Sequence, residues 1–536
     1  MKKIIYSLSL LLFFSSCKQQ QVDLIVTNAT IYTVNDAFSK AEAFAIKDGK
    51  FVDVGSKSEI TTKYSSKEIL DANGKTIVPG LIDAHCHFFR MGLQQQKVSL
   101  EGTKSYDEVL ERLIAFQKEK NVTFITGRGW DQNDWEVKEF PTKEKLDILF
   151  PNTPVAIRRI DGHALLANQA AIDITKVTKN TQVTGGEIIV KDGKMTGVFI
   201  DAAMDFIQVP KPTKSTSIQG LKDAEQIAFS YGLTTVDDAG LEQSTIELID
   251  SLQKENELKI RIYAMVSATQ KNLDYYINKG IIKTDKLHVR SFKIYGDGAL
   301  GSRGAAMRES YSDRSNHFGA LIYNPERYRE MAKQIAASEY QMNTHAIGDS
   351  ANTWILKTYK NFLQGKTNKR WRIEHAQIIA PEDFTLFENV IPSVQPTHAT
   401  SDMYWAQDRI GKERMKGAYA YKDLLEVYGK VALGTDFPVE QVNPFLTFYA
   451  AAVRKDTDGY PDSGFQIENR LSREETLKGM TIWAAYSNFE ENEKGSIEVG
   501  KLADFTILDQ NIMTVDALKI PKTKAIATYV NGEKVY

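Results

Sequence analysis

The feature that most constrains the fold of this chain is an alternation of strand-like and helix-like segments across its middle. Eight short runs rich in β-branched and aromatic residues follow one another, and helical patterns such as residues 217–232 and 325–340 separate several of them. The runs cover residues 81–88, 234–240, 260–267, 289–296, 342–348, 372–377, 391–397 and 431–438. Eight strand–helix units in series predict an α/β fold, a (β/α)8 TIM barrel.

Between the first and second runs lies a segment that is far too long for one connecting helix, at roughly residues 93–222. It contains helical stretches, a part around Trp130, and the sequence GGEIIVKDGKMTGVFI, which is typical of a β-hairpin. We therefore expect an insertion at the mouth of the barrel, where the loops of such a fold carry function.

Both ends of the chain are rich in strand-forming residues. Residues 22–78 alternate short strand-like runs with turn signals, and residues 504–509 and 524–536 have the same texture. Neither end has enough strands for a stable sheet, so we expect the two ends to pair into one small β-sandwich. The predicted boundaries are 22–79 and 489–536 for the two parts of the sandwich and 80–488 for the barrel.

The N-terminus has the pattern of an export signal. Lys2 and Lys3 precede an apolar run that is too short to cross about 30 Å of hydrocarbon, and small residues lead into Cys17. The segment resembles a bacterial lipoprotein signal, with residues 1–16 removed, Cys17 lipidated and residues 17–21 as a tether. We therefore expect an exported lipoprotein, anchored in a membrane of the cell envelope. An ordinary signal peptide cut nearby is the alternative.

Composition limits the partners of the chain. Its 67 Lys and Arg residues against 69 Asp and Glu give a formal net charge of -2, and 42% of the residues are hydrophobic. Such a balance gives no overall electrostatic field that would favour nucleic acid. We expect a small-molecule substrate at a local site, no nucleic acid, and membrane contact only through the lipid anchor. A homodimer is compatible with the sequence.

Polar groups that suit a metal ion stand near the ends of the predicted strands. His85 and His87 are two residues apart, so a strand projects them from one face. The other candidates, near the ends of the fourth, fifth, sixth and eighth runs, are Lys293, His345, His375 and Asp436. These ends converge in a barrel, and His and Asp ligands suit zinc or another first-row divalent ion. A structural role is the alternative for an isolated His-x-His pair.

A set of motifs extends from about Val22 to Tyr536. They are PGLIDAHCH, GWDQNDW, DGHALLANQAAI, FKIYGDGALGSRGA, HAIGD, RIEHAQ, SVQPTHATSD, LGTDFPV and GSIEVGKLADFTILD. Together they resemble the amidohydrolase superfamily of metal-dependent hydrolases, and within it the amidohydrolase-3 branch, which includes YtcJ-like proteins and N-substituted formamide deformylases.

The resemblance implies a role for each metal-site candidate. His85 and His87 hold the more buried ion, Asp436 ligates it and shuttles the proton, and His345 and His375 hold a second ion. Lys293 matches a lysine that relatives carboxylate to bridge two ions. Since an ammonium group has no acceptor for a cation, Lys293 is a ligand only when carboxylated or deprotonated. The expected cofactor is zinc or another divalent ion, one or two per chain.

The implied activity is hydrolysis of a non-peptide carbon–nitrogen bond in an N-substituted amide, a formamide or a cyclic imide. Metal-bound hydroxide attacks the carbonyl carbon, and Asp436 passes the water proton to the leaving nitrogen.

Other residues are candidates for the substrate side of the site, namely His163, His398, Asp297 and Trp130. The two histidines match family positions where an imidazole donates to a developing oxyanion, and structural hydrogen bonding is the alternative for each. The aspartate orients the site or forms an ordinary Asp-Gly turn. The tryptophan contributes an aromatic wall or packs in a core. His288 and His317 lie outside the motif ends and are expected at the surface.

Two other classes of function are alternatives to the hydrolase. Lys293 could serve as a Schiff-base nucleophile in a barrel aldolase, but the surrounding histidines argue against that chemistry. The chain could also be a catalytically silent lipoprotein that binds a small molecule on the barrel scaffold. All six expected ligands are present, which favours the enzyme.

Overall fold

The computed structural model describes residues 19–536 except 184–185 and 367, and the chain divides into two compact units. Unit 1 comprises the residues up to His87 together with Gln226–Tyr536, and unit 2 comprises Phe88–Glu225. The predicted export signal and Cys17 lie outside the described residues. Within the described part, no helix has the length and apolar character needed to cross a membrane.

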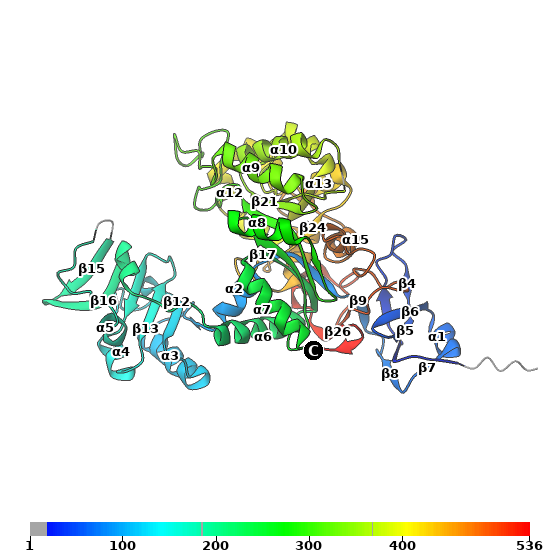
Figure 1. Ribbon diagram of the computed structural model, residues 1–536, viewed down its shortest axis with the longest axis horizontal. Helices are drawn as coiled ribbons and strands as arrows, with labels where there is room; N and C mark the ends of the chain where they lie inside the picture. Colours follow the sequence, from blue (N-terminus) through cyan, green and yellow to red (C-terminus); the bar gives the residue numbers. More distant parts are fainter. Residues whose placement is uncertain (1–18, 184–185, 367) are drawn as a thin grey trace, which may run out of the picture. The chain divides into compact units, whose positions relative to one another are not determined.

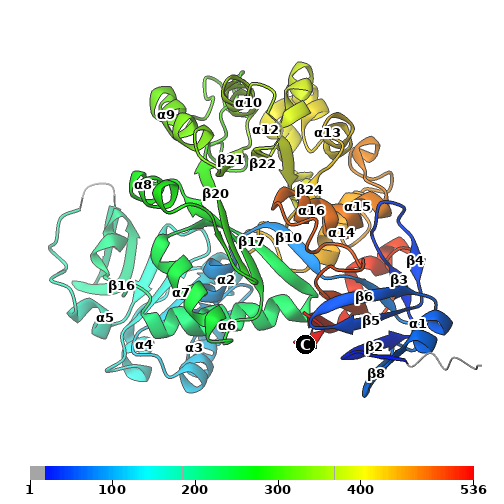
Figure 2. The ribbon, with the colours of Figure 1, turned by 45° about the vertical axis from the view of Figure 1, so that its right-hand side comes forward.

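Unit 1 is built around eight parallel strands that follow one another in sequence order. They are β10 (Leu81–Cys86), β17 (Leu233–Leu241), β18 (Arg261–Ser267), β20 (Leu287–Tyr295), β21 (Gln341–Ala346), β22 (Arg372–His375), β23 (Ile391–Val394) and β24 (Ala432–Leu433). Each strand pairs in parallel with the next one in this series. The predicted α/β architecture is confirmed as a nearly closed barrel of the TIM type (Figure 2).

Helices connect the barrel strands and follow the last of them. They are α7 (Gln243–Lys254), α8 (Gln270–Lys279), α9 (Pro325–Ala336), α10 (Asp349–Leu363), α11 (Pro396–Asp402), α12 (Ala406–Arg414), α13 (Tyr421–Tyr428), α14 (Pro444–Val453), α15 (Arg473–Gly479) and α16 (Ile482–Ser487). Their starts follow local signals: Asn324 caps α9 ahead of Pro325, and Thr269 caps α8. The connection from β22 to β23 carries a 3₁₀ helix, Pro381–Asn389.

The first and last barrel strands meet at their carboxyl ends. The backbone N–H of Asp436 donates to the carbonyl of His85 at 2.8 Å, and Asp83 Oδ1 accepts the backbone N–H of Thr435 at 3.0 Å. Gly434 permits this approach, because a Cβ atom there would lie 2.5 Å from the backbone nitrogen of His85. The closure therefore brings the residues after β24 next to those of β10.

The two ends of the chain form two larger sheets in unit 1, beside a two-stranded one. One has the order β6-β5-β2-β8, with β2 (Leu24–Thr27), β5 (Ala43–Lys47), β6 (Lys50–Gly55) and β8 (Glu68–Asp71). The other has the order β27-β26-β25-β9-β3-β4, with β3 (Thr30–Tyr32), β4 (Lys40–Ala41), β9 (Thr76–Pro79), β25 (Phe505–Leu508), β26 (Ala525–Val530) and β27 (Glu533–Lys534).

The predicted pairing of the two chain ends is confirmed in the second sheet, where β9 and β25 run antiparallel. Side chains of both sheets share one apolar cluster, in which the ring of Phe505 lies 5.0 Å from that of Phe44 and stacks on Tyr529 at 4.3 Å. These sheets fall in the same compact unit as the barrel. A separate β-sandwich domain therefore stays a prediction.

The predicted tether at residues 17–21 is wrong for its last two residues. Gln20–Gln21 form a short strand, β1, which pairs in parallel with β7 (Tyr64–Ser65), a strand that follows helix α1 (Lys57–Lys63). Polar side chains do not prevent this pairing, because the sheet hydrogen bonds come from the backbone.

Unit 2 contains one mixed sheet with the order β11-β12-β13-β14-β16-β15 (Figure 1). Its elements are α2 (Phe88–Gln94), β11 (Val98–Ser99), α3 (Tyr106–Lys120), β12 (Ile125–Trp130), α4 (Glu144–Leu149), β13 (Val155–Arg159), β14 (Ala164–Ala167), α5 (Gln169–Asp173), β15 (Gly186–Lys191) and β16 (Lys194–Asp201), and α6 (Lys214–Ser230) follows them. The antiparallel pair β15 and β16 confirms the expected hairpin. Its place at the mouth of the barrel stays a prediction.

The expectation that His288 lies at the surface is wrong. This residue belongs to β20, is 4% exposed, and has Nδ1 3.2 Å from Oε1 of the buried Glu490. Burial lowers the pKa of His288 below its usual value, against the opposing effect of Glu490. The folded chain therefore favours the neutral imidazole, whose N–H donates to the carboxylate.

This burial makes stability depend on pH. The unfolded chain protonates His288 at a higher pH than the folded chain does. The contribution of neutral His288 to the free energy of unfolding is therefore present above the ordinary His pKa of about 6.5, and it is lost as the pH falls below that value. We expect the free energy of unfolding in urea to drop more steeply between about pH 7 and pH 5 in the wild type than in His288→Gln. Parallel pH curves for the two proteins would contradict this expectation.

Candidate active site

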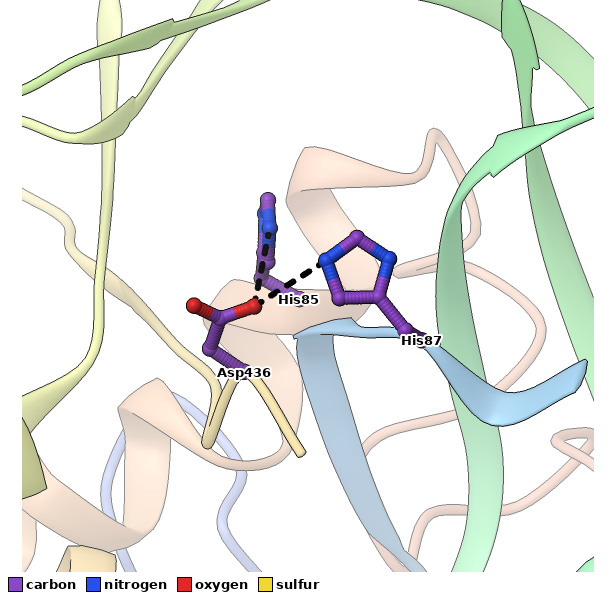
Figure 3. Close-up of side chains that lie close together, drawn as sticks. All are labelled: His85, His87 and Asp436. Atoms are coloured by element: carbon purple, nitrogen blue, oxygen red, sulfur yellow. Dashed lines mark ion pairs between the residues drawn. The ribbon is translucent and has the colours of Figure 1, made fainter. Parts of the chain in front are cut away.

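Three side chains face one another at the carboxyl ends of β10 and β24. His85 lies in β10, His87 follows that strand, and Asp436 follows β24, as Figure 3 shows. Nε2 of His87 lies 3.2 Å, and Nε2 of His85 3.7 Å, from Oδ1 of Asp436. The His85 side chain is fully buried, whereas that of His87 is 14% exposed. The group is therefore enclosed but reaches solvent on the side of His87.

Both imidazoles have their other ring nitrogen held by an acceptor. Nδ1 of His85 lies 2.6 Å from Oε2 of Glu374, and Nδ1 of His87 lies 3.0 Å from the carbonyl oxygen of Ala239. When each Nδ1–H donates to its acceptor, the lone pair remains on Nε2, on the side of Asp436. Metal-binding histidines are oriented by such outer hydrogen bonds.

This group of three residues fits a divalent metal ion. Oδ1 of Asp436 is buried without a hydrogen-bond partner among the described residues, and a buried charged oxygen is costly unless it is compensated. The donor atoms of His85, His87 and Asp436 all lie within 4.8 Å of one another. Imidazole nitrogen and carboxylate oxygen are ordinary ligands of zinc and similar ions.

Lys293 lies beside this group. It is on β20, and its Nζ is 3.1 Å from Nε2 of His85. Burial lowers the pKa of Lys293 to about 8, although the charges of Glu374 and Asp436 act in the opposite direction. The uncharged amine is therefore accessible near neutral pH, and it is the form that reacts with carbon dioxide or donates a lone pair.

A second group of potential ligands consists of His375, His398 and Asp436. His375 ends β22, and His398 lies in α11, the helix that follows β23. The group therefore takes residues from two further strand–helix units of the barrel. Nε2 of His398 is 3.4 Å from Oδ2 of Asp436, and its Nδ1 is 3.0 Å from Oε1 of Glu440. Burial opposes protonation, but the hydrogen bonds to Asp436 and Glu440 raise the pKa of His398 to about 10.

His345 and Asp297 lie next to these groups. The His345 ring is 4.5 Å from that of His375, and its Nε2 is 3.6 Å from Oδ1 of Asp297. Asp297 also accepts the backbone N–H groups of Ala306, Ile347 and Gly348 at 2.8–3.0 Å. This carboxylate therefore ties the loop after β20 to the end of β21, which is an orienting role. A direct substrate contact by Asp297, which is 1% exposed, has no support in this geometry.

Two site residues have unusual backbone conformations. Asp436 and His375 have φ angles of 64° and 75°, in the left-handed region that residues other than glycine seldom adopt. Such strain persists where surrounding contacts hold it, and it is concentrated at functional sites. Both residues belong to the candidate ligand groups described above, so the strained backbone coincides with the candidate site.

The remaining substrate-side candidates belong to unit 2. Trp130 is fully buried in the apolar core of this unit and donates its indole N–H to the carbonyl of Ile157 at 3.0 Å. This is the packing role, because no surface of the side chain is open to a ligand within the unit. The His163 side chain is 74% exposed and has Nδ1 2.7 Å from Oδ1 of Asp201. The expected oxyanion role of His163 stays a prediction.

Three acidic residues of the site were not predicted from the sequence. Glu374 and Glu440 orient the imidazoles of His85 and His398, and Asp83 accepts hydrogen bonds from Thr435 and from the backbone of His85. Asp83 and Glu374 carried a signal, since each is a charged residue inside a run of strand formers and must find a partner when buried. Glu440 is in a loop, and its position four residues after Asp436 is not distinctive.

Comparisons with known proteins identify the family to which this chain belongs. Residues 68–536 match the model of the amidohydrolase family. The chain is 32% identical to protein LONG AFTER FAR-RED 3 of Arabidopsis thaliana, over 96% of this chain and 91% of that one. It is 29% identical to the putative amidohydrolase YtcJ of Bacillus subtilis, over 94% and 98% of the two chains.

Two further proteins are similar to this chain over most of its length. An N-substituted formamide deformylase of Arthrobacter pascens is 24% identical, over 96% of this chain and 98% of the relative. The crystal structure of an uncharacterized metal-dependent hydrolase of Pyrococcus furiosus superimposes with a TM-score of 0.77 and 26% identity, covering 92% of this chain and all of that one. The resemblance expected from the motifs is thus confirmed, and this chain belongs to the amidohydrolase family.

Proposed function

We propose that this chain hydrolyses a non-peptide carbon–nitrogen bond in a small amide-like compound, with a divalent metal ion held by His85, His87 and Asp436. The observation that carries the proposal is the orientation of the donors. Both imidazoles present Nε2 to one carboxylate oxygen while Glu374 and the Ala239 carbonyl hold the opposite nitrogens. Zinc is the ion that we expect, since it suits a mixed histidine and carboxylate set.

A bound divalent ion polarises carbonyl oxygens and makes water more acidic. The chain itself supplies the positions of the proton-transfer groups. Asp436 is placed to take a proton from water and to pass it to the departing nitrogen, and His398 Nε2 faces its other oxygen at 3.4 Å. Glu374 holds His85 in one tautomer, and Lys293 at 3.1 Å supplies either a positive charge or, if carboxylated, another oxygen ligand.

The substrate class is proposed from the relatives. The deformylase relative is named for N-substituted formamides, and the YtcJ relative for amidohydrolase activity. We propose that the substrate is an N-substituted amide, a formamide or a cyclic imide. The potential metal ligands are His85, His87, Lys293, His345, His375 and Asp436. A small-molecule substrate of this kind needs no protein or nucleic acid partner.

The test is a screen of the metal-replete full chain. It uses N-substituted formamides, simple amides and cyclic imides, and it measures the released amine and acid. We expect turnover of at least one class, loss of that turnover after chelator dialysis, and recovery when zinc is returned. Binding of a compound with no turnover by metal-replete protein would contradict the proposal and favour the silent binding module.

We also propose that the chain is exported and anchored by a lipid on Cys17. Support comes from the basic, apolar and small-residue order of residues 1–17. In cells fed a labelled fatty acid, we expect the wild-type chain to carry the label in the membrane fraction. The Cys17→Ala chain should lose the label and leave that fraction, because the lipid supplies the anchor. A labelled Cys17→Ala chain, or an unlabelled wild type, would refute the anchor.

A further inference from the structure

Four cationic side chains gather near the β11 edge of the sheet in unit 2. All four are exposed, and they are Arg90 on α2, Lys97 just before β11, Arg128 on β12 and Arg158 on β13. We propose that this group, the cationic patch, binds a phosphate group, either of a soluble phosphorylated compound or of the headgroups on an anionic membrane surface. The patch is separate from the proposed metal site, and its role does not depend on the hydrolase.

Two guanidinium groups of the patch project from paired strands. β12 and β13, both labelled in Figure 1, run parallel, and Arg128 stands directly opposite Arg158 in their register. Paired strands lie about 4.8 Å apart, so the two side chains leave the same face of the sheet as close neighbours. Like charges on directly opposite residues destabilise a sheet. An anion bound between the two guanidinium groups would remove this cost.

The other two members of the patch add their charges at the same place. β11 pairs with β12 so that Ser99 stands opposite Arg128, and Lys97 lies two residues before Ser99. Desolvation and the positive charges of the other three members lower the pKa of Lys97. No carboxylate within the described part of the chain acts against this effect on Lys97. The four charges are therefore close enough to repel one another.

The patch has hydrogen-bond donors that no protein group uses. A guanidinium group carries five N–H donors. Among the described residues, the Arg128 side chain has one hydrogen bond, in which Nη2 donates to the carbonyl of Ile160 at 3.0 Å. In the same part of the chain, the side chains of Arg158 and Lys97 have neither a hydrogen bond nor an ion pair. These donors are available to a ligand.

The next residue along β13 shows the opposite arrangement. Successive residues of a strand point to opposite faces, so Arg159 leaves the other face of β13 from Arg158. Arg159 forms ion pairs with both Asp131 and Asp161, and its side chain is only 11% exposed. Unit 2 thus supplies carboxylates where an arginine is part of its own structure, and it supplies none to the patch.

Phosphate suits the charge and the donors of the patch. Arginine binds phosphate oxygens through paired N–H groups, and lysine binds phosphate as a point charge. A phosphate monoester carries about 1.5 to 2 negative charges at pH 7 and three acceptor oxygens, whereas a carboxylate carries one charge. An anionic membrane offers several phosphate groups side by side. Four unpaired cations are therefore compensated better by phosphate than by a single carboxylate.

The first test measures binding of phosphates to the full chain by isothermal titration calorimetry. The ligands are inorganic phosphate, pyrophosphate and citrate. The patch variant is Arg128→Gln with Arg158→Gln. The matched control removes two positive charges elsewhere in unit 2, by Lys118→Gln on α3 with Lys176→Gln after α5, and both of these lysines are exposed.

We expect phosphate and pyrophosphate to bind the wild type and the control with equal affinity. The patch variant should bind them at least about 10-fold more weakly, because hydrogen bonds between charged groups are lost. Undiminished binding by the patch variant, an equal loss in the control, or tighter binding of citrate than of pyrophosphate would each overturn the proposal.

The second test separates the two sources of the phosphate group. Vesicles of phosphatidylglycerol or of phosphatidylcholine are floated with the Cys17→Ala chain, so that no lipid on Cys17 contributes. Preferential flotation with phosphatidylglycerol that the patch variant loses assigns the patch to a membrane surface. Binding of soluble phosphates without such flotation assigns it to a phosphorylated compound. A chain that shows neither kind of binding would refute the phosphate site.

Removal of a single charge tests the repulsion within the patch. In the absence of ligand, Arg158→Gln should be at least as stable toward urea as the wild type, because the like charge opposite Arg128 is gone. The same measurement verifies that the variant folds. A clear loss of stability would show that the Arg158 side chain serves the fold, and it would overturn its assignment to a ligand site.

Discussion

Replacement of His87 by Ala is expected to remove the metal ion of the first group and to lower turnover by roughly 10³-fold or more, because a metal ion is worth several kcal/mol in the transition state. His87 supplies a lone pair 3.2 Å from Oδ1 of Asp436, and its side chain is partly exposed. The variant should therefore keep its fold. Elemental analysis measures the metal content of the variant, and circular dichroism measures its fold. Hydrolysis of the compound found in the screen measures its turnover.

His85→Ala is expected to lose the ion as well, but at a cost in stability. The His85 side chain is fully buried against Glu374 at 2.6 Å, so its removal leaves a buried carboxylate without this donor. His317→Ala is a suitable control, since His317 donates to or accepts from no residue of the two ligand groups that the structure describes. Full turnover by metal-free protein, or by either ligand variant, would refute the assignment.

Arg372→Met is expected to destabilise the barrel by about 3–5 kcal/mol, the usual cost of removing one partner from a buried ion pair. Arg372 is fully buried, and its Nη1 lies 3.0 Å from Oδ2 of Asp237, which is also fully buried. Its guanidinium donates to the carbonyls of Ala84 and Ser487 as well. The methionine variant would leave the carboxylate of Asp237 without its cation.

Urea unfolding of metal-free protein measures this effect. A second variant, Arg372→Met with Asp237→Asn, should recover part of the loss because neither charge then remains in the barrel. Lys63→Met is the surface control: its exposed pair with Asp53 is screened by solvent, and no measurable change is expected. A single Arg372→Met variant as stable as the wild type would refute the role of this pair.

Much of the fold could be predicted from the sequence. Each of the eight strand-like runs between residues 81 and 438 overlaps a barrel strand, in the same order. The reason is that a buried parallel strand needs a continuous apolar run, and its connecting helix needs a different periodicity. The pairing of β9 with β25 followed from the shortage of strands at each end.

The errors arose where local pattern and tertiary contact disagree. Gln20 and Gln21 look like a flexible polar tether, yet backbone hydrogen bonds place them in β1. His288 stands outside the motifs, yet Glu490 covers it from a segment some 200 residues later in the chain. For Trp130 the sequence left two roles open, an aromatic wall and core packing, and the structure shows the residue in the core of unit 2.

The sequence by itself determined the barrel, the family and most of the candidate ligands, because strand periodicity, strand ends and short motifs are local properties. The tertiary structure decided how the ligands are grouped. It joined Asp436 to His85, His87 and His398, and it supplied Glu374 and Glu440 as their outer partners. Those contacts cross up to 351 residues of chain, from His85 to Asp436, and only closure of the barrel brings such distant residues within a few ångströms.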